Sequence, residues 1–210
     1  MLDFERRAWA SGLRRVAGMD EAGRGPLAGP VVAAAVLFDQ AFLEREADAA
    51  LRGLTDSKQL SESRREYFFQ VLSASPSVLF GIAQAEVEEI DTHNILAATH
   101  LAMSRALMRV SPLPDHVLVD GLPVPGLPCP STAIVGGDGR SLSIAAASVL
   151  AKVTRDRLMV ELDARYPGYG FARHKGYGTK EHLEALRRLG PCSCHRRSFG
   201  PVSQMELGLE

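Results

Sequence analysis

The sequence predicts an α/β protein in which a mixed sheet is flanked by helices. Short apolar runs typical of buried strands come first, and segments with helical spacing alternate with strands afterwards. Hydrophobic residues make up 46% of the chain and charged residues 23%, which is enough apolar material for a core. A length of 210 residues suits one domain, or one domain with a small appendage.

Two buried strands open the predicted sheet, over Val16 to Asp20 and Val31 to Phe38. The turn between them is E-A-G-R-G-P-L-A-G-P, which is dense in glycine and proline, as expected where a backbone turns sharply or approaches a ligand. A helix is expected over Gln40 to Leu51, and a loop then carries Thr-Asp-Ser-Lys at 55–58.

The middle of the chain alternates helix and strand. Ser61 is expected to cap a helix that runs to about Ser73, because its hydroxyl can accept from the first free amides. A strand over Val78 to Glu86 follows, and Asn94 is placed to cap a long helix that reaches about Val110.

Two short strands are expected over His116 to Asp120 and Ser131 to Val135, before a long helix over Ser141 to about Tyr166. Three alanines at 145–147 in this helix predict a close approach to the sheet. A glycine-rich loop, a helix over Lys180 to Leu189 and an irregular tail complete the chain.

Charge is nearly balanced, with a formal net charge of −1. This argues against a protein that coats nucleic acid over its whole surface, but it leaves room for a local basic groove. Acidic residues crowd the segment 44–91, whereas Arg and Lys crowd 152–197. We therefore expect one face of the molecule to be more positive than the rest.

Targeting and redox signals are weak. The N-terminal segment is amphipathic and charged, without an apolar run of signal-peptide length, and the most apolar stretch, 30–38, is far too short to span a bilayer. Three cysteines cannot form a complete disulfide framework. We expect a cytoplasmic protein that acts as a monomer and has no membrane partner.

Four carboxylates lie beside glycines where predicted strands end. Asp20 and Glu21 close the first strand, Asp120 closes a later one, and Asp138 lies in the turn G-G-D-G. Oxygen ligands without a matching set of His and Cys favour hard cations such as Mg²⁺ or Mn²⁺. Two such ions about 3.5–4 Å apart can cleave a phosphodiester. Taken singly, each acid is equally well explained as a turn-capping residue.

The segment G-M-D-E-A-G-R-G-P-L-A-G-P at 18–30 closely resembles the opening signature of ribonuclease HII, the type 2 ribonuclease H family. The resemblance covers about residues 15–202. Five further motifs follow in the order of that family: Asp56-Ser57-Lys58, Asp120-Gly121, S-I-A-A-A-S-V-L-A-K-V-T-R-D at 143–156, H-K-G-Y-G-T at 174–179, and H-R-R-S-F at 195–199.

This resemblance implies the ribonuclease H-like α/β fold with a small helical C-terminal region. The expected parts are a catalytic core at 1–165, a substrate-contacting region packed on it at 166–202, and a flexible tail at 203–210. Family members often carry a basic residue near Gly136, and its absence here implies the loss of one phosphate contact.

The implied activity is endonucleolytic hydrolysis of RNA paired with DNA, and cleavage at ribonucleotides embedded in duplex DNA. The implied cofactor is a pair of Mg²⁺ or Mn²⁺ ions, and the products are a 3′-hydroxyl and a 5′-phosphate. The family's metal-binding acids carry over onto the four carboxylates named above, with Asp20 as the ligand shared by both ions.

Substrate choice requires a group that senses the ribose 2′-hydroxyl. The resemblance assigns this role to the backbone of the turn Gly23-Arg24-Gly25 and to Tyr177. A tyrosine that only anchors its loop in the core is the alternative for Tyr177. The candidate phosphate contacts are Lys58, Arg173 and Lys175, although loop cations are often simply solvated.

Two rival functions are weighed against this one. Another metal nuclease on the same fold, such as a resolvase or an exonuclease domain, is expected to lack the paired G-R-G and H-K-G-Y motifs. A module that binds hybrids without cutting them is expected to lose at least one metal-binding acid, whereas all four are present.

Two features near the C-terminus are left over. Cys192-x-Cys194-His195 is a partial ligand set without a distant mate, so the sequence does not predict a structural zinc. Gln204, Met205, Leu207 and Leu209 are spaced like the short peptides that dock on bacterial sliding clamps, which makes a clamp a candidate partner. The alternative is that Met205 and Leu207 pack back on the domain.

Overall fold

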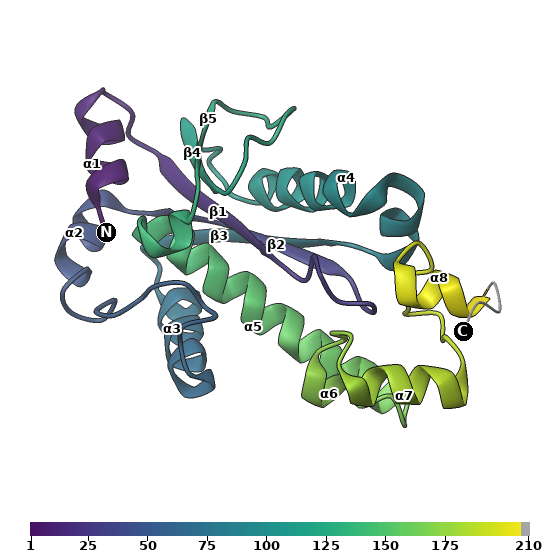
Figure 1. The fold of residues 1–210 in the computed structure, drawn as a ribbon. Coiled ribbons are helices and arrows are strands. Elements are labelled where there is room, and N and C mark those ends of the chain that lie inside the picture. The colour runs from purple at the N-terminus through teal and green to yellow at the C-terminus, as the bar shows by residue number, and fades with distance from the viewer. Residues whose placement is uncertain (207–210) are drawn as a thin grey trace.

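The computed structural model of the chain describes residues 1–206, with side chains to 205, and shows a five-stranded sheet with helices on both faces (Figure 1). The strand order is β3-β2-β1-β4-β5. This architecture confirms the fold class that the sequence predicts. No helix in the described part of the chain is long and apolar enough to cross a membrane.

The sheet is antiparallel on one side of β1 and parallel on the other. β1 (Val16–Ala22) and β2 (Val31–Phe38) are antiparallel neighbours, and β3 (Val78–Ala85) extends the antiparallel side. β4 (His116–Asp120) is parallel to β1, and β5 (Ser131–Ile134) is parallel to β4. The carboxyl ends of β1, β4 and β5 therefore lie at the same edge.

Strand register brings two acidic residues to that edge. Met19 of β1 pairs with Val119 of β4, so Asp20 and Asp120 follow at the same level on adjacent strands. Backbone hydrogen bonds of the sheet thus set the spacing of these two residues, without any contact between their side chains.

Both faces of the sheet are covered by helices. α4 (Val87–Met108) packs on one face, and α3 (Glu62–Ala74) and α5 (Leu142–Arg165) pack on the other (Figure 1). All eight residues of β2 are buried, alternating between these two apolar clusters. The alanines at 145–147 are fully buried in the α5 cluster, which confirms the expected close approach to the sheet.

Several element boundaries differ from the sequence prediction. α2 (Gln40–Glu46) ends before Leu51, because the Glu46 carbonyl accepts from the Ala49 and Leu51 amides in a tight turn. α4 begins at Val87 and bends at Asn94, whose φ is 70°. The Asn94 side chain still caps the second part of the helix, since its Oδ1 accepts from the next free amides at 2.9 and 3.1 Å.

Four short elements are absent from the sequence prediction: α1 (Asp3–Ala10), η1 (Gly137–Gly139), α6 (Phe171–His174) and α8 (Gly200–Glu206). The helix expected near Lys180 to Leu189 is present as α7, with its N-cap at Thr179. Short helices carry little periodicity, and their stability comes from packing instead.

The C-terminal region gathers at the far end of α5 (Figure 1). α6, α7 and α8 enclose a cluster of buried residues that also includes Leu27 and Ala28 of the β1–β2 turn and Met159 of α5. We call this the C-terminal cluster. Residues 203–206, expected in a flexible tail, form the end of α8, whereas Leu207 and Leu209 lie outside the described residues.

Candidate active site

Three of the four predicted acids meet at the carboxyl edge of the sheet. Asp20 lies in β1 just beyond the last residue that pairs with β4, Asp120 ends β4, and Asp138 lies in η1 just after β5. One carboxylate oxygen from each lies within 4.8 Å of the other two. The Asp120 Oδ1 accepts from the Gly137 amide at 2.7 Å, which holds η1 against the end of β4.

Electrostatic repulsion within this cluster favours the binding of a cation. Burial raises the pKa of Asp20 well above its ordinary value, and the neighbouring charges of Glu21 and Asp120 raise it further. The pKa of Asp138 is raised by burial and then by the charges of Asp120 and Asp56. The donors are all carboxylate oxygens, the ligands that Mg²⁺ and Mn²⁺ prefer. The residues present therefore fit hard divalent cations.

Glu21 lies beside this cluster but outside the group of three. Successive side chains leave a strand on opposite sides, so Glu21 and Asp20 diverge. The Glu21 Oε1 lies 3.3 Å from Nη1 of Arg24. Because Glu21 also lines the pocket next to the cluster, it connects the two parts of the site.

A pocket of about 320 Å³ adjoins the carboxylates. It brings together five of the seven residues that the sequence analysis proposes for nucleic-acid contact: Gly23, Arg24, Gly25, Lys58 and Tyr177. Lys152 and Arg155 also line it, and the sequence analysis assigned no role to either. The K-V-T-R-D part of the motif at 143–156 contains both residues and could have indicated a role for them.

Lys58 faces the acidic cluster. Burial lowers the pKa of Lys58, but the charges of Asp20, Asp56 and Asp138 outweigh it and raise the pKa overall. The loop that carries Lys58 is fixed to α5, because the Ser148 hydroxyl donates to Ser57 Oγ at 2.8 Å. A cation is thus held beside the carboxylate cluster.

The G-R-G turn packs against the buried side chain of Arg155. Gly23 has a φ of +99°, and a Cβ added there would lie 2.0 Å from Arg155 Nε. Arg155 donates hydrogen bonds to the carbonyls of Ala28, Pro30 and Lys175 at 3.0–3.1 Å. Glycine at 23 is therefore required both by the backbone conformation and by the guanidinium beneath it.

A second buried arginine holds the same turn from the C-terminal side. Arg196 donates to the carbonyls of Gly23, Arg24 and Gly29 at 2.6–2.9 Å. Burial lowers the pKa of Arg196 to about 9, and the charge of Arg155 acts in the same direction. The group remains cationic at neutral pH, and carbonyl dipoles offset its burial.

Tyr177 sits at the mouth of the pocket with 44% of its surface exposed. A Cβ added at Gly25 would lie 3.7 Å from Cε1 of the Tyr177 ring. The chain turns just before it at Gly176, where φ is +81° and a Cβ would lie 2.6 Å from the Ala28 carbonyl oxygen. This exposure argues against a tyrosine that only anchors its loop in the core.

The other two basic candidates lie away from the pocket. Arg173 forms an ion pair with Glu181 at 2.9 Å. The Lys175 Nζ donates to the Ala172 carbonyl at 2.6 Å, and this residue lines a separate hollow beside α3 and α5. Neither lines the pocket that contains Tyr177.

Comparison with curated proteins finds close relatives over nearly the whole chain. The chain is 54% identical to ribonuclease HII of Geobacillus kaustophilus over 98% of its length and 75% of that protein. It is also 54% identical to ribonuclease HII of Moorella thermoacetica, over 93% of this chain and 91% of that protein.

Solved structures show the same fold. Ribonuclease H2 from Pyrococcus horikoshii aligns with a TM-score of 0.77 and 28% identity, over 93% of this chain and 98% of that one. RNase HII in the PCNA:RNase HII complex from Archaeoglobus fulgidus aligns with a TM-score of 0.72 and 25% identity, over 89% of this chain and 95% of that one.

A family model described as Ribonuclease HII matches residues 17–202, a span that contains every residue of the carboxylate cluster and the pocket. The match includes the core of the sheet and most of the C-terminal region. The chain therefore belongs to the ribonuclease HII family, whose members are metal-dependent endoribonucleases.

Proposed function

We propose that the protein hydrolyses the RNA strand of RNA/DNA hybrids and also cuts at ribonucleotides embedded in duplex DNA. The observation that carries this proposal is the juxtaposition of the two parts of the site. The three-carboxylate cluster adjoins a pocket lined by the G-R-G turn and Tyr177, with Glu21 between them. We propose that the cluster is the cleavage centre and that the adjoining groups contact the sugar.

The carboxylates are proposed to hold two divalent cations, Mg²⁺ or Mn²⁺. When bound, such ions activate the attacking water and stabilise charge on the departing 3′ oxygen, which leaves a 3′-hydroxyl and a 5′-phosphate. Asp20, buried between Glu21 and Asp120, is the ligand proposed to be shared. Glu21, Asp120 and Asp138 complete the two ligand sets.

The remaining side chains are proposed to position the nucleic acid. Lys58 contacts a phosphate near the cleaved bond, since it already faces the acids. Backbone groups of Gly23 to Gly25 approach the 2′-hydroxyl, and Tyr177 stacks on the neighbouring nucleotide. Arg173 and Lys175 are kept as weaker candidates for distant phosphate contacts, because they lie outside the pocket.

The test uses a DNA duplex with one ribonucleotide and a matched all-DNA duplex. We expect cleavage beside the ribonucleotide only with Mg²⁺ or Mn²⁺, and no cleavage of the all-DNA duplex. A hybrid with a continuous RNA strand measures the first activity separately. Cleavage of the hybrid alone would restrict the proposal to hybrids and remove a role in excision of embedded ribonucleotides.

A second proposed property is docking on a sliding clamp through Gln204 to Leu209. It is supported by the solved complex of PCNA with RNase HII from Archaeoglobus fulgidus, which is similar to this chain. Attachment to a clamp would raise the local concentration of the enzyme at its sites on DNA. The described part of the segment, 204–206, lies in α8 with the Gln204 side chain exposed.

A further inference from the structure

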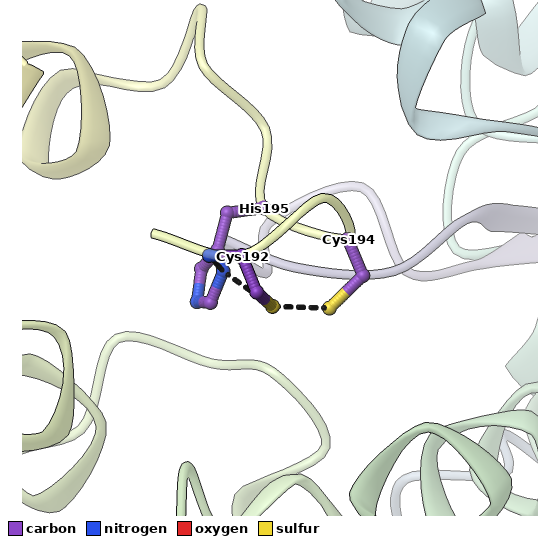
Figure 2. Close-up of side chains that lie close together, drawn as sticks. All are labelled: Cys192, Cys194 and His195. Atoms are coloured by element: carbon purple, nitrogen blue, oxygen red, sulfur yellow. Dashed lines mark hydrogen bonds between the residues drawn. The ribbon is translucent and has the colours of Figure 1, made fainter. Parts of the chain in front are cut away.

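Two cysteines and a histidine converge in the loop between α7 and α8 (Figure 2). The Sγ atoms of Cys192 and Cys194 lie 3.2 Å apart, and Cys192 Sγ lies 3.1 Å from Nδ1 of His195. Cys194 and His195 are buried, with 7% and 1% of their surface exposed, and Cys192 is partly exposed. These three residues form the Cys-His cluster.

The protonation of His195 follows from its neighbours. His182 Nδ1 lies 2.9 Å from the Tyr177 carbonyl oxygen, which only accepts, so His182 must donate there. In neutral His182 the Nε2 atom then has no proton and accepts from His195 Nε2, 3.0 Å away. The neutral His195 ring therefore presents an unprotonated Nδ1 to Cys192 Sγ, which in turn contacts Cys194 Sγ.

This arrangement matches the way in which proteins prepare a histidine ligand. A metal-binding histidine usually donates its other N–H to a second residue, which fixes the tautomer and the ring orientation. Here that second residue is His182, a buried side chain of α7. The Cys192 amide donates to His195 Nδ1 at 3.0 Å, and this hydrogen bond would be replaced when a metal ion binds.

We propose that Cys192, Cys194 and His195 bind one zinc ion. Two sulfur ligands and one imidazole nitrogen suit zinc, at about 2.3 Å and 2.0–2.1 Å, and do not suit Mg²⁺ or Mn²⁺. The short separations need to open by about half an ångström around an ion, because tetrahedral ligands at these bond lengths lie about 3.6–3.8 Å apart. A water molecule would supply the fourth ligand, since Cys192 is partly exposed.

The ion would stabilise both loops that line the pocket, the G-R-G turn and the loop that carries Tyr177. Through His195 and His182 it is connected to the Tyr177 backbone. The Cys194 carbonyl accepts from the Gly29 amide at 2.8 Å, and the next residue after His195 is Arg196, which holds the G-R-G turn. The zinc would thus stabilise the G-R-G turn and the Tyr177 loop, which line the pocket.

The test measures binding of Cd²⁺, which absorbs in the ultraviolet when it is bound to thiolates. Reduced full-length protein is titrated with Cd²⁺, and Zn²⁺ is then added to displace it. We expect thiolate absorption that saturates at one equivalent and is reversed by Zn²⁺. Carboxylate sites do not produce this signal, so the result does not depend on nuclease activity or on the proposed catalytic ions.

Variants locate the ligands. Cys192→Ser and Cys194→Ser are each expected to weaken binding by more than about 100-fold, and His182→Gln by about 10- to 100-fold. Cys129→Ser is the matched control, because Cys129 packs against the α4 side of the sheet and should leave binding unchanged.

Three outcomes would overturn the proposal. One is the absence of thiolate absorption in folded wild-type protein, and another is unchanged absorption in the double variant Cys192→Ser/Cys194→Ser. The third is a Cys192–Cys194 disulfide that forms in air in the presence of equimolar Zn²⁺, detected by mass spectrometry. That result would identify a redox pair instead of a metal site.

Discussion

The carboxylate edge of the sheet and the C-terminal cluster are held in place in different ways. At the sheet edge, the positions of Asp20 and Asp120 follow from strand register over an aliphatic core. In the C-terminal cluster, aromatic and histidine rings pack with centroids 4.5–6.0 Å apart. The loops there are held by side chains that donate to backbone carbonyls, chiefly Arg155 and Arg196.

This difference separates two kinds of sensitivity to mutation. A backbone ladder holds its residues whatever their side chains, so an acid at the sheet edge can be replaced without loss of the fold. A buried arginine that donates hydrogen bonds to several carbonyls cannot be replaced without destabilising the fold, because its removal leaves those carbonyls without partners. We therefore expect chemistry to fail first at the sheet edge and structure to fail first in the C-terminal region.

The largest expected effect is on catalysis by Asp20→Asn. Loss of the shared ligand should lower Mg²⁺-dependent cleavage by more than about 100-fold, beyond the loss typical of an outer-shell ligand partner. The measurement is cleavage rate on the single-ribonucleotide duplex. Near-normal cleavage by this variant would contradict the assignment of Asp20.

The same variant should remain folded. A carboxyl whose pKa is raised in the folded state costs stability once the pH rises above its unfolded pKa, and that cost is present at neutral pH. Asparagine removes this repulsion, so thermal unfolding without metal should occur at the same temperature or higher. A large fall in melting temperature would show that the sheet edge also depends on its side chains.

The reverse pattern is expected for Arg196→Met. Three carbonyls lose their donor, and the free energy of unfolding should fall by about 3 kcal/mol or more. Denaturant unfolding measures this loss, with Arg187→Met on the exposed surface of α7 as the control. Equal stability of the two variants would refute the proposed role of Arg196 in holding the turn.

Much of the sheet side could be predicted from the sequence. Strand-length apolar runs and a buried alanine segment have periodicities that local residues determine, so β2 and α5 were placed almost to the residue. The four acids stand out in the sequence because they lie near glycines where predicted strands end. Their arrangement in space depends on side-chain direction, which explains why Glu21 stands apart from the other three.

The C-terminal side was less predictable for a physical reason. α6 and α8 are too short for helical periodicity and exist because they pack on the C-terminal cluster. Arginine is normally a surface residue, so nothing local indicates that Arg155 and Arg196 are buried. Their roles depend on carbonyls more than 120 positions away in the sequence.

Tyr177→Ala tests whether the C-terminal region acts on substrate as well as on structure. The exposed ring contributes little to the fold, so stability should change little. Misplacement of the sugar should reduce cleavage at a single ribonucleotide by about 10- to 100-fold, with a smaller loss in binding to the same duplex. Tyr177→Phe keeps the ring and should retain most of the rate. Equal losses in binding and rate on all substrates would indicate a merely structural tyrosine.

The smallest effect on catalysis is expected at the end of the chain, where Gln204 is exposed on α8 and Met205 is partly buried against the C-terminal cluster. A peptide that docks in an extended form must release Met205 from this contact, which reduces the affinity for a clamp by the cost of freeing it. Gln204→Ala should therefore leave cleavage and stability unchanged while it weakens clamp binding. A chain that ends at Ser203 should lose that binding, and it should also lose some stability because Met205 is removed. Titration of a bacterial sliding clamp with the full chain and both variants distinguishes the two effects. If all three bind equally, or none binds at micromolar concentration, residues 204–209 do not form the docking segment, and the nuclease proposal is unaffected.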